Sequence, residues 1–201
     1  VGTIHAYCFR LLQTYVPEYE SYTPLDENQI VNLLYREASQ LNLRQFDAGG
    51  GLFRGIAAFR RSVDVIENEL IDPTSLPFDA FFAAVQDYYA MLDRYRVMSF
   101  GTQIVRAVQA LEDANIHARV TADARHLIVD EYQDVNPAQE RLVSLLARPN
   151  GNADLVVVGD DDQAIYQWRG STVSNIVTFA DRYPGSAQFH LLQNRRSRPD
   201  I

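Results

Sequence analysis

Apolar residues recur at steps of three and four through the first half of the chain, a spacing that predicts amphipathic helices. These stripes cover Ile4–Leu12, Ile30–Leu41, Leu52–Leu70, Phe78–Tyr95 and Ile104–Leu111. Thr3 can cap the first helix, and Thr23-Pro24-Leu25-Asp26 predicts a capping box with proline at the first position of the second helix. No convincing strand is predicted between Thr23 and about Asn115, where the last of these helices is expected to end.

Short apolar runs rich in branched residues replace this pattern after Asp123. They lie at 126–130, 154–159 and 188–192, and helices are predicted from Asn136 and over roughly 172–183. Strand, helix, strand, helix, strand is typical of parallel pairing with helices on the faces of the sheet. The sequence therefore predicts an α/β fold in which a partial parallel sheet is flanked by helices. The all-helical stretch is then an insertion between the first helix and the sheet.

Charge and cysteine content narrow the class of protein. The 201 residues carry a formal net charge of -8, which excludes a uniformly basic, histone-like surface. All 18 basic residues are arginine, so no lysine is present to hold a nucleotide phosphate, form a Schiff base or act as a general base. Cys8 is the single cysteine, which excludes an internal disulfide and a multi-thiolate zinc site, and the four histidines lack metal-ligand spacing.

The chain also lacks the usual signals for membranes and secretion. No apolar run is long enough to span a bilayer, and the first residues form no signal sequence, so a cytoplasmic protein is expected. Val1-Gly2-Thr3 has no initiator methionine, and we therefore expect the chain to be a piece of something longer.

Carboxylates follow the first two predicted strands. Asp130 and Glu131 end the first strand, with Asp134 close behind, and Asp160-Asp161-Asp162-Gln163 follows the second. Because ligands bind beyond the carboxyl ends of parallel strands, these acids are expected at one edge of the sheet, where they need a cation. Oxygen ligands suit Mg²⁺, which usually keeps several waters and bridges to phosphates. The alternative is that each acid only caps the helix that follows it.

Two further segments carry residues suited to nucleic acids or phosphates. Tyr166, Trp168 and Arg169 stand together, and aromatic faces beside a guanidinium can stack single-stranded bases and hold a phosphate. The alternative is that both rings fill the core. Asn194-Arg195-Arg196-Ser197-Arg198 follows the third predicted strand and could meet a triphosphate or a nucleic-acid backbone. The alternative for these arginines is a solvated surface.

The order of these segments resembles the UvrD/Rep/PcrA group of superfamily 1 DNA helicases. The similarity rests on four stretches, at residues 3–12, 128–139, 158–171 and 192–197. The first is similar to the family's Thr-Phe-His segment, which approaches single-stranded DNA, and the second to its Walker B motif. The third is similar to the motif that couples ATP to DNA, and the fourth to the Asn-Tyr-Arg-Ser motif. The second and third stretches are long and specific, and the resemblance spans the whole chain.

This resemblance implies roles for individual residues. Asp130 would hold Mg²⁺ through water, Glu131 would orient or deprotonate the attacking water, and Gln163 would sense the terminal phosphate of ATP. Arg196 would be the arginine finger that stabilises charge on the transferred phosphoryl group. Four residues would contact single-stranded DNA, with stacking on bases by the tyrosine and the tryptophan: His5, Tyr166, Trp168 and Arg169. The alternative for the histidine is a place in the first helical turn without contact to DNA.

The chain departs from the family's pattern at several positions. The Gly-Lys-Thr loop that cradles phosphates is missing and is expected upstream of Val1, and the second RecA-like domain is expected after Ile201. Arg195 replaces the usual tyrosine of Asn-Tyr-Arg-Ser, and Met98–Gln103 stands where many relatives have an Asp-Phe-Asp-Asp run. No family role is carried over to that last segment.

We therefore expect residues 1–22 and 116–201 to be part of a RecA-like motor domain 1A, and residues 23–115 to form an inserted helical subdomain 1B. The parent protein would couple Mg-ATP hydrolysis to movement along single-stranded DNA with 3′ to 5′ polarity, and the isolated chain would be inactive. Its expected partners are ATP, single-stranded DNA and the remaining helicase domains, with no membrane. Two alternatives stay open: a non-catalytic DNA- or protein-binding module derived from a motor, and a Mg²⁺-dependent nuclease built on the carboxylates.

Overall fold

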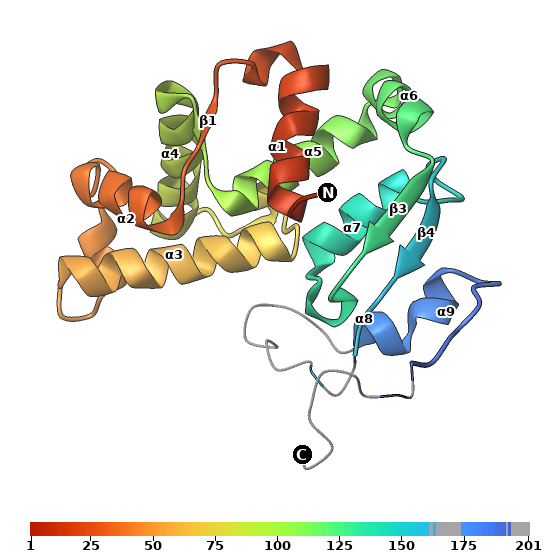
Figure 1. Cartoon of the computed structure of the whole chain (residues 1–201). Coiled ribbons are helices and arrows are strands. Elements are labelled where there is room, and N and C mark those ends of the chain that lie inside the picture. Colours follow the sequence, from red (N-terminus) through yellow and green to blue (C-terminus); the bar gives the residue numbers. More distant parts are fainter. Residues whose placement is uncertain (161–162, 164–173, 192, 194–201) are drawn as a thin grey trace.

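The structure, a computed structural model, describes residues 1–160, 163, 174–191 and 193 (Figure 1). Its α-helices are α1 (Ile4–Tyr15), α2 (Glu27–Arg36), α3 (Leu52–Asn68), α4 (Ala80–Tyr95), α5 (Phe100–Glu112), α6 (Ala114–Asp123), α7 (Pro137–Leu146), α8 (Ser174–Val177) and α9 (Phe179–Arg182). Short 3₁₀ helices are η1 (Pro17–Tyr19), η2 (Leu43–Phe46), η3 (Pro73–Ser75) and η4 (Tyr132–Asp134). The strands are β1 (Thr23–Pro24), β2 (Val97–Met98), β3 (His126–Val129) and β4 (Asp154–Val157). In this described part of the chain, no helix is long and apolar enough to cross a lipid bilayer.

The predicted helices of the first half are present, and side-chain caps explain where several of them begin. The Thr3 hydroxyl accepts a hydrogen bond from the Ala6 amide at 3.2 Å, which caps α1 as predicted. The predicted capping box at Thr23 is wrong, because the box is made by Asp26 and Gln29 at the start of α2. Asp26 caps because its carboxylate can accept from the exposed amides of the first turn.

A second correction explains why the helix does not begin at Thr23. Residues Thr23 and Pro24 pair in parallel with Val97 and Met98, although no strand was predicted between residues 23 and 115. The Thr23 amide donates to the Arg96 carbonyl at 2.9 Å, and the Leu25 amide donates to the Met98 carbonyl at 2.8 Å. Strands of two residues are too short to leave an alternating pattern in the sequence.

The larger parallel pair, β3 and β4, is confirmed, with register from His126 opposite Asp154 to Val129 opposite Val157. The predicted third strand is wrong over residues 188–191, which form no strand in the structure. Phe189 and Leu191 are 87% and 93% exposed, so this apolar run has no packing partner among the described residues. A strand needs a neighbour for its backbone hydrogen bonds, and composition alone cannot supply one.

Two helical predictions also need correction. The helix expected to end near Asn115 ends at Glu112, and α6 follows at once because Asp113 accepts hydrogen bonds from the Asn115 and Ile116 amides. The single helix expected over 172–183 is divided, in its described part, into α8 and α9 around Thr178. Only Val120 and Thr121 of α6 are buried, which explains why its apolar pattern is faint in the sequence.

Apolar side chains gather in two main clusters. Helices α2, α3 and α4 share one cluster, centred on Phe59 and Tyr88, at one end of the molecule (Figure 1). Helices α1, α5, α6 and α7 share the other, which includes the wholly buried Leu12 and Ala107. A smaller cluster, formed by Val129, Tyr132, Val135 and Val143, lies between β3 and α7. The chain thus separates a purely helical end from an end that carries the β3–β4 sheet.

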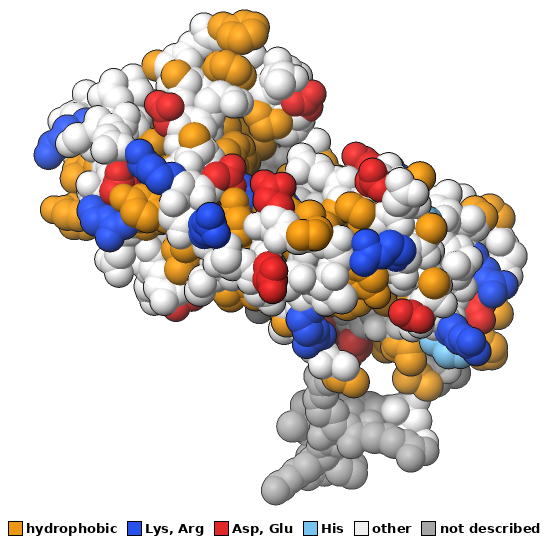
Figure 2. Space-filling view, turned by 90° about the horizontal axis from the view of Figure 1, so that it is seen from above, with side chains coloured by type: hydrophobic (Ala, Val, Ile, Leu, Met, Phe, Trp, Pro, Cys, Tyr) orange, Lys and Arg blue, Asp and Glu red, His pale blue; other side chains and the backbone are white. Residues whose placement is uncertain are grey.

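Charged side chains of both signs are interspersed on one face of the molecule (Figure 2). On the face shown in Figure 2, arginines and acidic residues alternate along the molecule instead of separating into one basic and one acidic region. Two arginine ion pairs, Arg141 with Glu112 and Arg148 with Asp154, join side chains that are both exposed. The charge on the face in Figure 2 therefore does not mark a binding surface.

Candidate active site at the carboxyl edge of the β3–β4 sheet

The chain leaves β3 in a tight turn that presents two carboxylates to solvent. The Val158 amide donates to the Val129 carbonyl at 2.8 Å, and the Tyr132 amide donates to the Val158 carbonyl at 2.9 Å, so both sides of the turn are tied to the residue that follows β4. Between these bonds Glu131 has a φ of 53° and a ψ of 42°, in the left-handed region, which costs a non-glycine residue about 1 kcal/mol. The Asp130 carboxylate accepts from the Glu131 amide at 3.0 Å. Both acidic side chains are exposed beyond the strand.

Gln133 connects this turn to the end of β4. Its side-chain amide nitrogen donates to the Glu131 carboxylate oxygen Oε2 at 2.7 Å, and its amide oxygen accepts from the Asp160 backbone amide at 3.0 Å. The Gln133 side chain is only 1% exposed. A buried amide that uses both of its ends is held in one orientation.

The loop after β4 brings Gln163 into the same group of side chains. The Gln163 side-chain amide donates to the Asp160 carboxylate at 2.5 Å, and the Gln163 backbone amide donates to the Asp160 carbonyl at 3.2 Å. Gly159 permits the close approach, since a Cβ atom there would lie 2.6 Å from the Gln133 amide oxygen. A continuous path of hydrogen bonds therefore runs from Glu131 through Gln133 and Asp160 to Gln163.

The electrostatics of this edge are dominated by carboxylates. The Asp134 oxygen Oδ1 is buried and has no hydrogen-bond partner among the described residues. Desolvation, with a smaller contribution from the Glu131 charge, raises the pKa of Asp134. A cation at the edge would relieve this accumulation of negative charge.

The donor set fits Mg²⁺. Within the described residues, no three histidine, cysteine or acidic side chains converge into a metal-binding group. Mg²⁺ does not need such a group, because it is usually bound through one or two carboxylates, several waters and the phosphates of a substrate. Exposed Asp130, with one oxygen on the Glu131 amide, is the carboxylate of this edge best suited to that arrangement.

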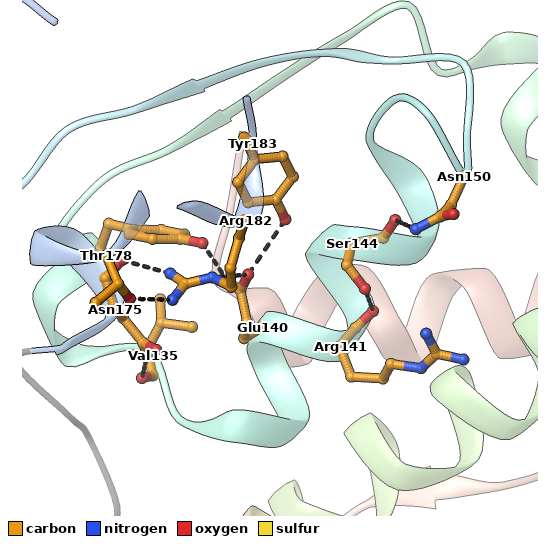
Figure 3. A network of polar contacts seen from close by, with 10 residues as sticks. Val135, Glu140, Arg141, Ser144, Asn150, Asn175, Thr178, Arg182 and Tyr183 are labelled. Carbon is orange, nitrogen blue, oxygen red and sulfur yellow. Dashed lines mark hydrogen bonds and ion pairs between the residues drawn. The ribbon is translucent and has the colours of Figure 1, made fainter. Parts of the chain in front are cut away.

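A second polar network holds the turn from the α7 side (Figure 3). The Glu140 carboxylate accepts hydrogen bonds from the Tyr132 hydroxyl, from Arg182 at 3.1 Å and from the Tyr183 hydroxyl at 3.2 Å. Burial, followed by the Glu140 carboxylate, raises the pKa of both Tyr132 and Tyr183, so both phenols stay protonated as donors. The network thereby fastens α9 to the residue that follows Glu131.

Arg182 extends this network to α8. Its guanidinium donates to the Thr178 hydroxyl at 2.7 Å and also to the Asn175 carbonyl. The Asn175 side-chain amide in turn donates to the Val135 carbonyl at 2.5 Å. Helices α8 and α9, which follow the residues after β4, are therefore held against the same turn that carries the acids.

Of the remaining predicted site residues, the structure describes only His5, which lies on α1 and makes no hydrogen bond to this group in the described part of the chain. The His5 ring centroid lies 5.0 Å from that of Phe100, and burial lowers the pKa of His5, which favours the neutral imidazole. The other four predicted residues lie outside the described part of the chain: Tyr166, Trp168, Arg169 and Arg196. The structure therefore describes Asp130, Glu131 and Gln163 of the predicted nucleotide site and, of the predicted DNA contacts, only His5.

A comparison with known sequences now decides the family. The family model of the UvrD/REP helicase N-terminal domain matches residues 1–184. The chain belongs to the UvrD/REP helicase family. The resemblance inferred from the sequence motifs is thereby confirmed.

Individual UvrD/REP relatives match over the whole chain. The ATP-dependent DNA helicase PcrA of Leuconostoc citreum is 32% identical over 214 residues, and DNA helicase II of Salmonella typhimurium is 30% identical over 213 residues. The ATP-dependent DNA helicase UvrD1 of Mycobacterium tuberculosis is 29% identical over 224 residues. The chain covers 27% of the length of the PcrA relative and 28% of each of the other two.

Sequence reasoning missed three residues that organise this candidate site: Gln133, Glu140 and Arg182. Gln133 lies two residues after Glu131, inside the stretch that resembles the Walker B motif. A single amide side chain among acidic ones could have indicated a residue that orients them. Glu140 and Arg182 gave no comparable signal, because they are 42 residues apart and meet only through the packing of α9 on α7.

Proposed function

We propose that this chain is part of the first motor domain of an ATP-dependent DNA helicase or translocase, which couples Mg-ATP hydrolysis to movement along single-stranded DNA. The observation that carries the proposal is the hydrogen-bond path from Glu131 to Gln163 at the carboxyl edge of the sheet. Membership of the UvrD/REP family and relatives named ATP-dependent DNA helicase support it.

Residues 1–22 and 116–201 would belong to the RecA-like motor domain, and residues 23–115 to the helical insertion. The separate apolar cluster of α2, α3 and α4 supports an insertion with a core of its own. Helix α5 packs on α1 and α7 through the second cluster, so it would fix the insertion to the motor domain.

Glu131 is suited to act on the water that attacks the terminal phosphate. Its side chain is exposed, and one carboxylate oxygen is held by Gln133, so the other remains to accept a hydrogen bond from that water. Gln163, at the end of the hydrogen-bond path, would contact the terminal phosphate. Gln163 would lose its contact when the terminal phosphate is released. Because Gln163 belongs to the loop after β4, hydrolysis would then change the position of that loop.

Asp130 would hold Mg²⁺ at the same edge. Bound there, Mg²⁺ would neutralise negative charge that develops on the phosphate oxygens. Arg196 would be the arginine finger. The phosphate-cradling lysine would come from outside this chain, which contains no lysine, and we therefore expect the isolated chain to be inactive.

Single-stranded DNA would be contacted by His5 and by the segment after Gln163, through Tyr166, Trp168 and Arg169. Aromatic stacking on bases is worth about 1–3 kcal/mol per base and tolerates any sequence. Because Asp160 stands between the acids of the site and this segment, the same loop would connect ATP hydrolysis to DNA. The direction of movement proposed for the motor is 3′ to 5′.

The proposal is tested by measuring steady-state ATP hydrolysis of the full-length protein with and without single-stranded DNA, in Mg²⁺ and in EDTA. We expect hydrolysis that needs Mg²⁺ and is stimulated by DNA, together with displacement of a strand from a duplex with a 3′ tail. The 201-residue chain alone serves as the control and should hydrolyse no ATP. DNA binding without any ATP hydrolysis by the full-length protein would instead favour the non-catalytic module, and nicking of a plasmid with Mg²⁺ alone would favour the nuclease.

A further inference from the structure

We propose that Gln133 is a positioning residue that holds the Glu131 carboxylate in its working orientation and links it to the loop after β4. This inference rests on the proposed function, because it assigns Glu131 the role of acting on water. Gln133 itself would touch neither ATP nor water, and would act only through Glu131 and Asp160.

The orientation of the Gln133 amide follows from its partners. The Asp160 backbone amide can only donate, so the Gln133 oxygen that lies 3.0 Å away must be the acceptor. The Gln133 NH₂ group must then face Glu131, where it donates to Oε2 at 2.7 Å. No other rotation of the amide satisfies both contacts.

Packing keeps the Gln133 side chain from leaving this position. The side chain is 1% exposed, and Gly159 lies against its amide oxygen so closely that a Cβ atom would come within 2.6 Å. Moving the buried amide away would break its hydrogen bond with the Asp160 amide, which is unfavourable. Glu131 by contrast is exposed and has a left-handed backbone, so without Gln133 the described structure leaves its carboxylate free to take up other rotamers.

Gln133 connects two parts of the proposed site, which a purely structural glutamine would not need to do. One end of Gln133 reaches the side chain of the proposed base in the turn after β3, and the other reaches the backbone of the loop that carries Gln163. A shift of that loop would move the Gln133 amide oxygen and would therefore change the orientation of the Glu131 carboxylate. Gln133 would thus make hydrolysis depend on the position of the loop after β4.

Two substitutions in the full-length protein separate the two contacts. Gln133→Met has similar length and removes both hydrogen bonds, whereas Gln133→Glu keeps an acceptor for the Asp160 amide and loses the donor to Glu131. We expect each variant to lower kcat for DNA-stimulated ATP hydrolysis by about 10- to 100-fold, because small misplacements of a catalytic group have effects of this size. ATP affinity should change by less than about threefold, since Gln133 does not contact the nucleotide.

A matched control and a double variant complete the test. Gln109 is exposed on α5, and Gln109→Met and Gln109→Glu should leave kcat unchanged. In a Glu131→Gln background, single-turnover hydrolysis should show no further loss from Gln133→Met, because both changes remove the same function.

Three results would overturn the inference. The first is a wild-type kcat for Gln133→Glu, which would mean that only the contact with Asp160 matters. The second is an equal fractional loss from Gln133→Met with and without Glu131→Gln, which would mark a general structural effect. The third is a loss of ATP affinity that matches the loss of kcat. If Gln133→Met fails to fold, Gln133→Glu still decides, and normal hydrolysis by Glu131→Gln alone would instead refute the proposed function.

Discussion

Acidic side chains meet opposite environments in two regions of this molecule, the contact between α3 and α5 and the edge of the β3–β4 sheet. Where α3 meets α5, Glu67 of α3 is 2% exposed, packed against Gly101 and 3.5 Å from the Ser99 hydroxyl, which donates to it. Desolvation raises the pKa of Glu67 to about 8, against the opposing effect of Arg60. At the sheet edge Asp130 and Glu131 stand in solvent. Burial thus makes one acid part of the fold, while exposure leaves the others free for chemistry.

The helical end and the edge of the β3–β4 sheet also differ in the interactions that stabilise them. In the helical end Phe59 lies 5.6 to 6.0 Å, between ring centroids, from the rings of Phe46, Tyr88 and Phe81, a packed aromatic cluster. The sheet edge relies instead on directed hydrogen bonds to Gln133 and Glu140. Aromatic packing stabilises without fixing the position of any one polar atom, whereas hydrogen bonds fix positions at a smaller gain in stability.

The largest expected change in stability comes from the aromatic cluster. Phe59→Ala should lower the free energy of unfolding by about 3–5 kcal/mol, because it leaves a cavity in a closely packed core. Phe53→Ala on the same helix is the control, since Phe53 is 74% exposed and its loss should matter by less than about 1 kcal/mol. Denaturant unfolding of the two variants measures the difference, and equal losses would show that the aromatic cluster is not a core.

Buried Glu67 predicts that the stability of the fold depends on pH. Between a pKa of about 4.5 in the unfolded chain and about 8 in the folded one, folded Glu67 keeps a proton that the unfolded chain has lost. The free energy of unfolding should therefore fall as the pH rises through this window, by roughly 1 kcal/mol per pH unit. Charged and titratable groups near Glu67 modulate the effect: Arg60, Asp64 and Arg106.

Glu67→Gln removes this proton and should flatten the dependence. Thermal unfolding of both proteins from pH 5 to pH 9 should show the variant gaining on the wild type up to about pH 8 and no further change above it. Parallel curves for the two proteins would mean that Glu67 is ionised in the fold across the whole range.

The polar network behind the sheet edge predicts an intermediate effect. Glu140→Gln should destabilise by about 1–3 kcal/mol, because its carboxylate receives three donors and its side chain is 14% exposed. Glu112→Gln is the matched control from the other ion pair of α7, with Arg141, in which the side chains are 54% and 44% exposed. That pair should contribute less than about 1 kcal/mol. Similar unfolding free energies for both variants would contradict a structural role for Glu140.

The smallest change is expected for the exposed acid at the end of β3. Asp130→Asn keeps an oxygen that can accept from the Glu131 amide, so the free energy of unfolding should change by no more than about 0.5 kcal/mol. Denaturant titration of the variant beside the wild type provides the measurement. A loss of 2 kcal/mol or more would place Asp130 with the structural acids such as Glu67.

Local patterns in the sequence were enough to predict much of this fold. Helical periodicity located α1 to α5, and two branched apolar runs located β3 and β4. The failures came where a structure depends on distant partners: the pairing of Thr23–Pro24 with Val97–Met98, and residues 188–191, which form no strand. Helix α6 was not predicted for a different reason. Only two of its residues are buried, so its apolar pattern is weak.

The candidate site, too, could be predicted from the sequence only in part. Asp130, Glu131 and Gln163 could be proposed from the sequence, because the ends of parallel strands meet at one edge whatever the details of packing. The partners that orient them could not, since the contact of Gln133 with Asp160 spans 27 residues and that of Arg182 with Glu140 spans 42. Strand order predicts which residues come together, and only the packed structure specifies which atoms meet.

The most direct test of the central claim is to measure ATP turnover, ATP binding and thermal unfolding for Glu131→Gln in the full-length protein. The account predicts a fall in DNA-stimulated turnover of at least about 100-fold, with ATP affinity and the unfolding temperature close to those of the wild type. Normal turnover in this variant, or a loss of turnover that only follows a loss of stability, would contradict the claim that the exposed acids of the sheet edge carry the chemistry.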